Sequence, residues 1–143
     1  MGKRKTRTIA QEIEAAAKLL QRLVRMKASD DNGYCQCVTC GKVDHYKAMQ
    51  GGHFIPRGRT RLKLMTENVN PQCAYCNQWG MKQAHYVLRY REYMVDMYGE
   101  RRVKAMEKLA WMPPPKFNRQ DILDLQKEFK EQIKEQEKRI SVY

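Results

Sequence analysis

The fold of this chain is decided by two short segments, CQCVTCG at residues 35–41 and QCAYCN at residues 72–77. Each contains two cysteines separated by two residues, a spacing that lets one tight turn point both sulfurs at the same metal ion. We therefore expect a structural Zn²⁺ held by four cysteines: Cys37, Cys40, Cys73 and Cys76. Four thiolates leave no open coordination position, so this zinc is expected to fold the chain and to perform no chemistry.

The fifth cysteine, Cys35, makes the choice of the first ligand pair ambiguous. The pair could also be Cys35 with Cys37, or Cys35 with Cys40. Gly41 relieves the turn after Cys40 and favours the pair Cys37 and Cys40. Cys35 is then expected to be a small buried or bystander thiol. The odd number of cysteines, their paired spacing and the lack of an export signal favour a reducing compartment over secretion, so we expect a cytoplasmic protein.

The chain is strongly basic, with a net charge of +12, and almost all of the excess lies before residue 112. A polyanion is the natural partner for such a segment. An acidic membrane surface is the competing partner, but no long, strongly apolar helix face accompanies the charge. No run of 18 apolar residues is present, so a membrane-spanning segment is not expected. The charge pattern favours nucleic acid.

Three segments differ in character. Residues 1–33 form a basic tail and an amphipathic helix over 8–28, and Thr8 and Gln11 have the spacing of a capping box. Residues 34–112 hold the cysteines and the following helices, and residues 113–143 form a proline linker and a charged helix over 118–140 capped by Asn118. The thin apolar stripe of this last helix predicts a partner helix, from this chain or from a second copy.

Within the middle segment we expect two short strands, at residues 46–55 and 61–65, joined by a turn that contains Gly58. A helical pattern begins after residue 77 and ends at Gly99, and a shorter helix over 101–111 ends at the prolines. The tyrosines and methionines of the first helix form either core or a base-stacking platform. The whole pattern predicts a mostly helical α+β protein with a small zinc-bound core between N-terminal and C-terminal helices.

His53 lies between the two cysteine pairs, in GGHF at residues 51–54. Two glycines precede it, and the arginines Arg57, Arg59 and Arg61 follow. If this run is extended, alternation places the three arginines on one face. Such a face suits contact with a phosphate backbone rather than with base edges.

The motifs CVTCG, GGHF, ENVNPQC and CAYCN, in this order, resemble the zinc-stabilised branch of the HNH (ββα-metal) endonucleases. More closely, GGHFIPRGRTRLKLMTENVNPQCAYCN followed by a tyrosine-rich helix is similar to the NinG (Rap) family of lambdoid phage recombination proteins, over about residues 35–95. The phage endonuclease VII family has a similar design. The resemblance implies a ββα-metal core and an endonuclease that cuts branched DNA such as Holliday junctions and D-loops, in the host cytoplasm if the chain is phage-encoded.

The resemblance also implies roles for single residues. His53 matches the general base that deprotonates a water, and an imidazole suits that role near neutral pH. Asn68 matches the asparagine that holds the loop orienting the histidine. Asn77 matches a ligand of a catalytic Mg²⁺ or Mn²⁺, which would stabilise charge on the phosphate. We expect Arg57 to clamp a phosphate.

One position departs from the HNH pattern, because Gly52 stands where many of these enzymes have an aspartate ligand. Glu67, His85 or Gln50 would have to complete the metal shell, or the substrate phosphate would supply ligands. A zinc-knuckle module that binds DNA without cutting it is the alternative. Symmetric cutting of a four-way junction needs two active sites, so we expect a homodimer, and recombination proteins are possible partners.

Overall fold

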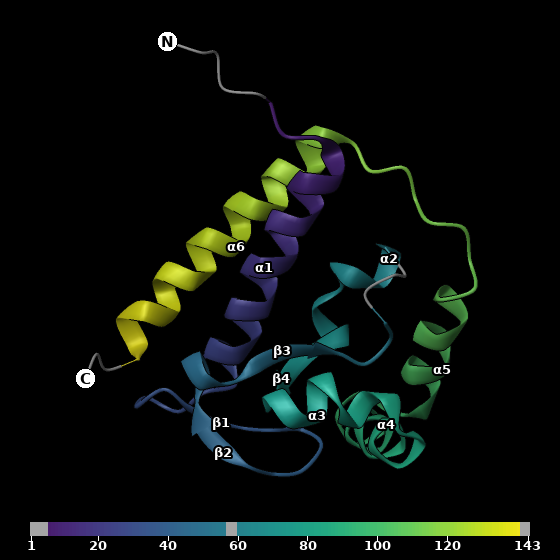
Figure 1. Ribbon diagram of the computed structural model, residues 1–143. Coiled ribbons are helices and arrows are strands. Elements are labelled where there is room, and N and C mark those ends of the chain that lie inside the picture. The colour runs from purple at the N-terminus through teal and green to yellow at the C-terminus, as the bar shows by residue number, and fades with distance from the viewer. Residues whose placement is uncertain (1–5, 57–59, 141–143) are drawn as a thin grey trace.

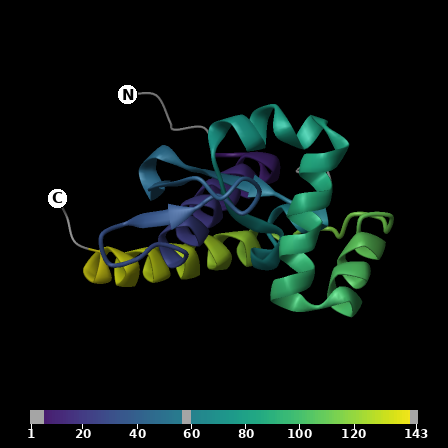
Figure 2. The same ribbon diagram turned by 90° about the horizontal axis from the view of Figure 1, so that it is seen from below.

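Two long helices, α1 (Ile9–Lys27) and α6 (Arg119–Arg139), lie side by side along one side of the molecule (Figures 1 and 2). The computed structural model describes residues 6–56 and 60–140. The two helices run in the same direction, since Gln126 contacts Glu12 near their starts and Arg139 contacts Met26 near their ends. The partner of the stripe on α6 is therefore a helix of this chain.

Both helix starts agree with the sequence patterns. Thr8 and Gln11 make the reciprocal hydrogen bonds of a capping box at α1, and the Asn118 side chain accepts from the Gln120 amide at α6. At the other end Arg139 donates to the carbonyls of Met26, in the last turn of α1, and of Ser29, just beyond it. A cation at this place is also favoured by the dipole of α1.

The strands form two separate antiparallel pairs. Strand β1 (Tyr34–Gln36) pairs with β2 (Val43–His45), and β3 (Gln50–His53) pairs with β4 (Val69–Gln72) in the register His53 opposite Val69. A 3₁₀ turn, η1 (Tyr46–Ala48), connects the two pairs, and a second one, η2 (Thr66–Asn68), precedes β4. The first pair carries the first cysteine turn, and the second pair carries His53.

The expected strand at residues 61–65 is wrong. Thr60–Lys63 is a short helix, α2, and the partner of β3 is β4. The alternation of Arg61-Leu62-Lys63-Leu64 resembles a strand, but helical backbone buries Leu62 completely against the side chains of α4 and α5. The expected strand at 46–55 is too long, since only Gln50–His53 has strand structure. The turn at Gly58 lies outside the described residues.

After the β3–β4 pair, the chain continues through α3 (Ala74–Gln78), the 3₁₀ turn η3 (Gly80–Lys82), α4 (Ala84–Tyr98) and α5 (Glu100–Leu109). The predicted stop at Gly99 is confirmed, with a φ of 87° that suits glycine. An extended segment that includes the three prolines then crosses from the end of α5 back to the start of α6 (Figure 1). This return explains how the last helix can run parallel to the first.

The β3–β4 ribbon lies between α1 and α4. Val69 joins the core formed with Leu20 and Leu23 of α1, whereas the Tyr90 hydroxyl of α4 donates to the Gly52 carbonyl at 2.7 Å. Tyr90 and Met94 are fully buried, which favours the core interpretation of that helix, but Met97 is 57% exposed. Across residues 6–56 and 60–140, none of the helices combines the length and apolar character that crossing a bilayer requires.

Candidate metal centre and histidine pocket

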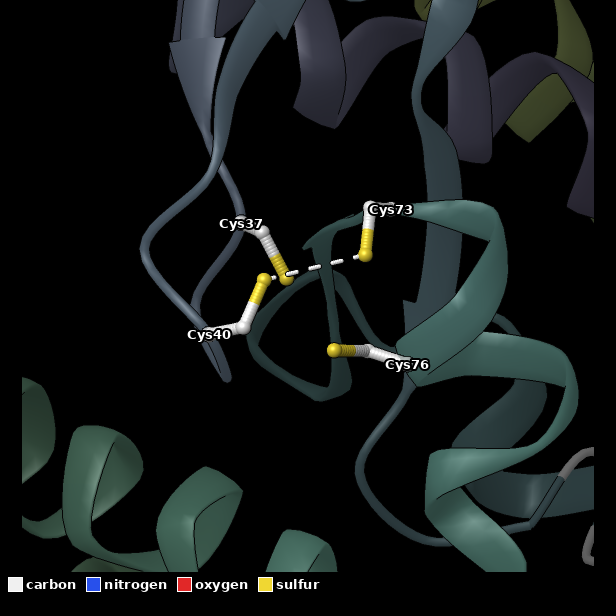
Figure 3. Close-up of side chains that lie close together, drawn as sticks. All are labelled: Cys37, Cys40, Cys73 and Cys76. Atoms are coloured by element: carbon white, nitrogen blue, oxygen red, sulfur yellow. Dashed lines mark hydrogen bonds between the residues drawn. The ribbon is translucent and has the colours of Figure 1, made fainter.

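The four expected zinc ligands come together in space. The sulfurs of Cys37, Cys40, Cys73 and Cys76 all lie within 4.8 Å of one another (Figure 3). The Sγ atoms of Cys40 and Cys73 are 3.7 Å apart. Sulfurs at the corners of a tetrahedron with Zn–S bonds of about 2.3 Å would be about 3.8 Å apart. The spacing therefore fits a zinc ion.

Local backbone structure aims each pair of sulfurs. After β1 the Gly41 amide donates to the Cys37 carbonyl, which closes the turn that carries Cys40. Cys73 is the N-cap of α3, and Cys76 lies in the first turn of this helix. One ligand pair thus belongs to a strand turn and the other to a helix start, and the cluster ties β1 to the end of β4.

The donor set also fits a metal chemically. Three of the four cysteines are buried and only Cys40 is exposed. Burial, and then the neighbouring thiols, raise the pKa of Cys76, because a thiolate in this cluster faces others of the same charge. A cation removes that repulsion. Cys35 is buried outside the cluster, so the choice of Cys37 with Cys40 agrees with the geometry.

A cavity of about 590 Å³ lies against β3, and two of the predicted site residues, His53 and Asn77, line it. Its wall combines apolar side chains, such as Met49, Phe54 and Met81, with polar side chains from four elements: Gln21, Arg25, Gln50, His53, Asn77, Gln78 and Lys82. The described residues of this wall include two cations and no Asp or Glu. Burial lowers the pKa of Arg25, but a guanidinium still remains charged near neutral pH. The cavity therefore favours an anionic ligand.

The His53 ring is held by the backbone. Its Nε2 lies 3.1 Å from the Lys63 carbonyl oxygen, which can only accept a hydrogen bond. Nε2 therefore carries the proton, and in the neutral imidazole Nδ1 holds the lone pair. An ion pair of Lys63 with Glu14 of α1 fixes the segment that supplies this carbonyl.

Asn68 is fully buried and fastens the segment between β3 and β4 at both ends. Its Oδ1 accepts from the Ile55 amide at 2.9 Å, and its Nδ2 donates to the carbonyls of Ile55 and Leu62 at 3.0 and 3.2 Å. Leu62 immediately precedes Lys63, the residue that holds the His53 ring. These contacts suit the positioning role that the resemblance implies for Asn68.

Asn77 also lies at the cavity, on α3, and its Nδ2 donates to Gln50 Oε1 at 2.7 Å. Of the three residues considered for completing a metal shell, Gln50 is the one at Asn77. Glu67 instead pairs with Arg102, and His85 is exposed on α4. Mg²⁺ prefers carboxylate and phosphate oxygens. The described wall offers an imidazole and only neutral side-chain amides, those of Gln21, Gln50, Asn77 and Gln78, so these residues do not by themselves make a Mg²⁺ or Mn²⁺ site.

Packing explains why Gly52 cannot be an aspartate here. A Cβ on Gly52 would lie 1.7 Å from Gln72 Oε1, and Gln72 is itself fully buried. A Cβ on Gly51 would meet the backbone of Gln21 on α1 at 2.8 Å. The two glycines of the GGHF segment therefore allow close approach on both faces of β3. The Gln72 side chain thus occupies the space that an aspartate at position 52 would need.

The expected arginine face is only partly testable. Arg57 and Arg59 lie outside the described residues. Arg61 lies in α2, so the extended-strand argument is wrong for it, and its Nη2 donates to the Pro113 carbonyl at 3.2 Å. The cations that do line the cavity, Arg25 and Lys82, were not expected. They come from a core-packing helix and from a 3₁₀ turn, and no local sequence pattern connects them.

Comparisons with curated proteins and with solved structures gave no significant match. A comparison with models of protein families matches residues 2–139 to NinG, described as the bacteriophage lambda NinG protein. The match spans nearly the whole chain and includes the cysteine cluster, the histidine cavity and both long helices. The chain therefore belongs to the NinG family of bacteriophage lambda.

Proposed function

We propose that this protein is a structure-specific DNA endonuclease that cuts branched recombination intermediates, with His53 as the general base. One observation carries the proposal: a backbone-anchored imidazole lines a cavity whose described wall contains cations and no carboxylate. Such a cavity suits a phosphodiester. The resemblance to the ββα-metal nucleases and membership of the NinG family support branched DNA as the substrate class.

In the proposed reaction, Nδ1 of His53 takes a proton from a water while the water oxygen forms a bond to phosphorus. The bond from phosphorus to the 3′ oxygen breaks, and the departing oxygen takes a proton from solvent. Lys82 and Arg25 stabilise the charge on the phosphate oxygens. Arg25 is fixed at the cavity wall, because its Nη1 donates to the carbonyls of Tyr46 and Met49.

In ββα-metal nucleases a divalent ion stabilises the phosphate and the leaving oxygen. The neutral donors Asn77 and Gln50 could contribute ligands only beside oxygens of the bound phosphate. We therefore expect that added Mg²⁺ or Mn²⁺ binds the free protein weakly. A zinc ion held by the four cysteines would have a separate, structural role.

The test compares nicking of a labelled Holliday junction by wild type, His53→Ala and His85→Ala, with and without added Mg²⁺ or Mn²⁺. Water deprotonation by a positioned base contributes about 10²- to 10⁴-fold. His53→Ala should lose at least about 10²-fold in nicking rate while zinc content and junction binding stay unchanged. His85 is an exposed histidine outside the cavity, so its variant controls for the loss of an imidazole. Equal nicking by wild type and His53→Ala would remove His53 from the mechanism.

A second function, DNA binding without cleavage, is favoured by the lack of a carboxylate in the described cavity wall. It predicts that wild type leaves junction, flap and single-stranded DNA uncut with either metal. A homodimer remains a prediction of symmetric junction cutting. Since α1 covers the apolar stripe of α6, a second copy would have to use another surface.

A further inference from the structure

Two large aromatic side chains are exposed beside the histidine cavity. Tyr75 on α3 is 56% exposed, and Trp79 at the end of this helix is 59% exposed. Their spacing of four residues places them on one side of the helix. In contrast, Tyr90 of the tyrosine-rich helix is fully buried. Tyr90 therefore belongs to the core, and the exposed rings of Tyr75 and Trp79 lie outside the helix for which the sequence left a stacking platform open.

Contacts with neighbouring side chains hold both rings in place. The Tyr75 ring makes an edge contact with Tyr86, with 6.0 Å between ring centroids. The Lys82 ammonium lies 5.1 Å from the centroid of the Trp79 ring. A ring that is already held loses little conformational freedom when a ligand stacks on it.

Lys82 connects the exposed rings to the cavity, because it lines the cavity and also contacts Trp79. α3 itself carries Asn77 at the cavity wall. A DNA backbone bound at His53 would thus run past the Lys82 ammonium and then reach the exposed aromatic rings. This combination, a basic groove with aromatic rings along it, is how proteins bind single-stranded nucleic acid.

We propose that Tyr75 and Trp79 form a stacking surface for unpaired DNA bases next to the scissile phosphate. The identity of the ligand as DNA rests on the proposed function. Paired bases in a duplex have no open face to offer, whereas bases at a branch point or gap do. The surface would therefore select DNA with unpaired bases over plain duplex.

The test measures binding and does not need cleavage. Wild type, Trp79→Ala, Tyr75→Ala and Trp111→Ala are titrated, without added divalent metal, against a duplex and against the same duplex with a short single-stranded gap. Stacking of one base contributes about 5- to 150-fold in affinity. Trp79→Ala should lose about this factor on gapped DNA and change duplex binding by less than about twofold. Trp79→Phe should keep most of the gapped-DNA affinity.

The second tryptophan of the chain supplies the matched control. Trp111 is 84% exposed but does not line the cavity, so Trp111→Ala should bind both DNAs like wild type. In Trp111→Phe, Trp79 is the sole tryptophan. Its fluorescence should be quenched by gapped DNA and much less by duplex. This measurement uses a ring that is still present, so it does not depend on how the alanine variant folds.

Two results would overturn the stacking surface. An equal loss on gapped and duplex DNA would mean that Trp79 serves only structure or general affinity. No loss on either DNA, with unquenched fluorescence, would mean that the rings serve another partner, such as a protein. Failure of the proposed function looks different: wild type would cut none of the DNAs, while the dependence of gapped-DNA binding on Trp79 would remain.

Discussion

The helical pair, α1 with α6, and the clamped unit, residues 34–82, are held together in different ways. The helical pair is held by a continuous apolar seam that includes Leu20, Leu23, Phe129 and Ile133. The clamped unit has strands of only three or four residues. Two-stranded ribbons this short are marginal in water. Part of its order comes from the apolar core that it shares with α1, through residues such as Cys35 and Val69. The rest comes from a few directional contacts, and the candidate site lies where those contacts meet.

This difference indicates which region of the chain tolerates substitution of a single side chain and which region does not. Dispersed apolar contact degrades gradually when one side chain changes. A cluster of four sulfurs or a single buried amide with three partners is lost when one group is removed. Function that needs atoms held in place therefore depends on the directional contacts, and changes there should separate the two regions.

Removal of the zinc should have the largest effect and should affect only one region. Cys76→Ser removes one ligand of the cluster. Structural zinc contributes about 10–16 kcal/mol in zinc-finger peptides near pH 7, so we expect loss of the metal and of order in the clamped unit. Amide hydrogen exchange should show lost protection over residues 34–82, while circular dichroism retains most of the helix signal.

The matched control is Cys35→Ala, which removes a buried thiol outside the cluster. It should keep one zinc per chain by elemental analysis. If Cys76→Ser also kept its zinc, the cluster would not be the metal site. If both regions lost protection together, the helical pair would depend on the clamped unit and the comparison would fail.

Loss of one buried amide should have the next largest effect. Asn68→Ala leaves the amide and the carbonyl of Ile55 without the Asn68 side chain as partner, while the Leu62 carbonyl keeps the Met65 amide at 3.2 Å. Buried groups left unpaired cost about 1–3 kcal/mol each and do not add fully, so unfolding free energy should fall by about 2–4 kcal/mol in a urea titration. Asn77→Ala, with one hydrogen bond at a half-buried position, should cost less than about 1 kcal/mol. Similar costs for both variants would contradict the special place of Asn68.

The helical pair could be predicted from the sequence, and much of the clamped unit could not. Capping residues and apolar spacing are local signals, and they gave α1, α6 and the stop at Gly99. The cysteine cluster was predicted because ligand spacing reports directly on a turn. Strand β4 was missed, since Val69-Asn70-Pro71-Gln72 has no clear alternation and pairs through contacts made elsewhere in the fold.

The cavity shows the same limit of prediction from the sequence. His53, Asn68 and Asn77 were found by resemblance, and the structure brings His53 and Asn77 to one cavity, with Asn68 holding its adjoining segment. Arg25 and Lys82 carry no signal in the sequence, because their shared place depends on how α1 packs against β3. The steric conflict between Gln72 and a side chain at position 52 likewise involves residues that lie 20 positions apart in the sequence.

The smallest effect expected is that of a partly exposed ion pair, Glu67 with Arg102, which ties η2 to α5. Hydrogen bonds from Arg102 hold the pKa of the Glu67 carboxyl below its ordinary value. Its stabilisation is therefore fully present above the ordinary glutamate pKa and is lost as pH falls through the lower folded-state pKa. Glu67→Gln should lower the free energy of unfolding by about 0.5–1 kcal/mol at pH 7, since partly exposed pairs contribute little.

A double-mutant cycle with Arg102→Gln measures this pair by urea titration at pH 7 and at several lower pH values. The coupling energy should shrink as pH drops below the ordinary glutamate range and should weaken with added salt. A coupling that stayed constant down to acid pH would mean that packing of the two side chains, rather than charge, joins η2 to α5. The charges of this pair would then add nothing to the directional contacts around Asn68.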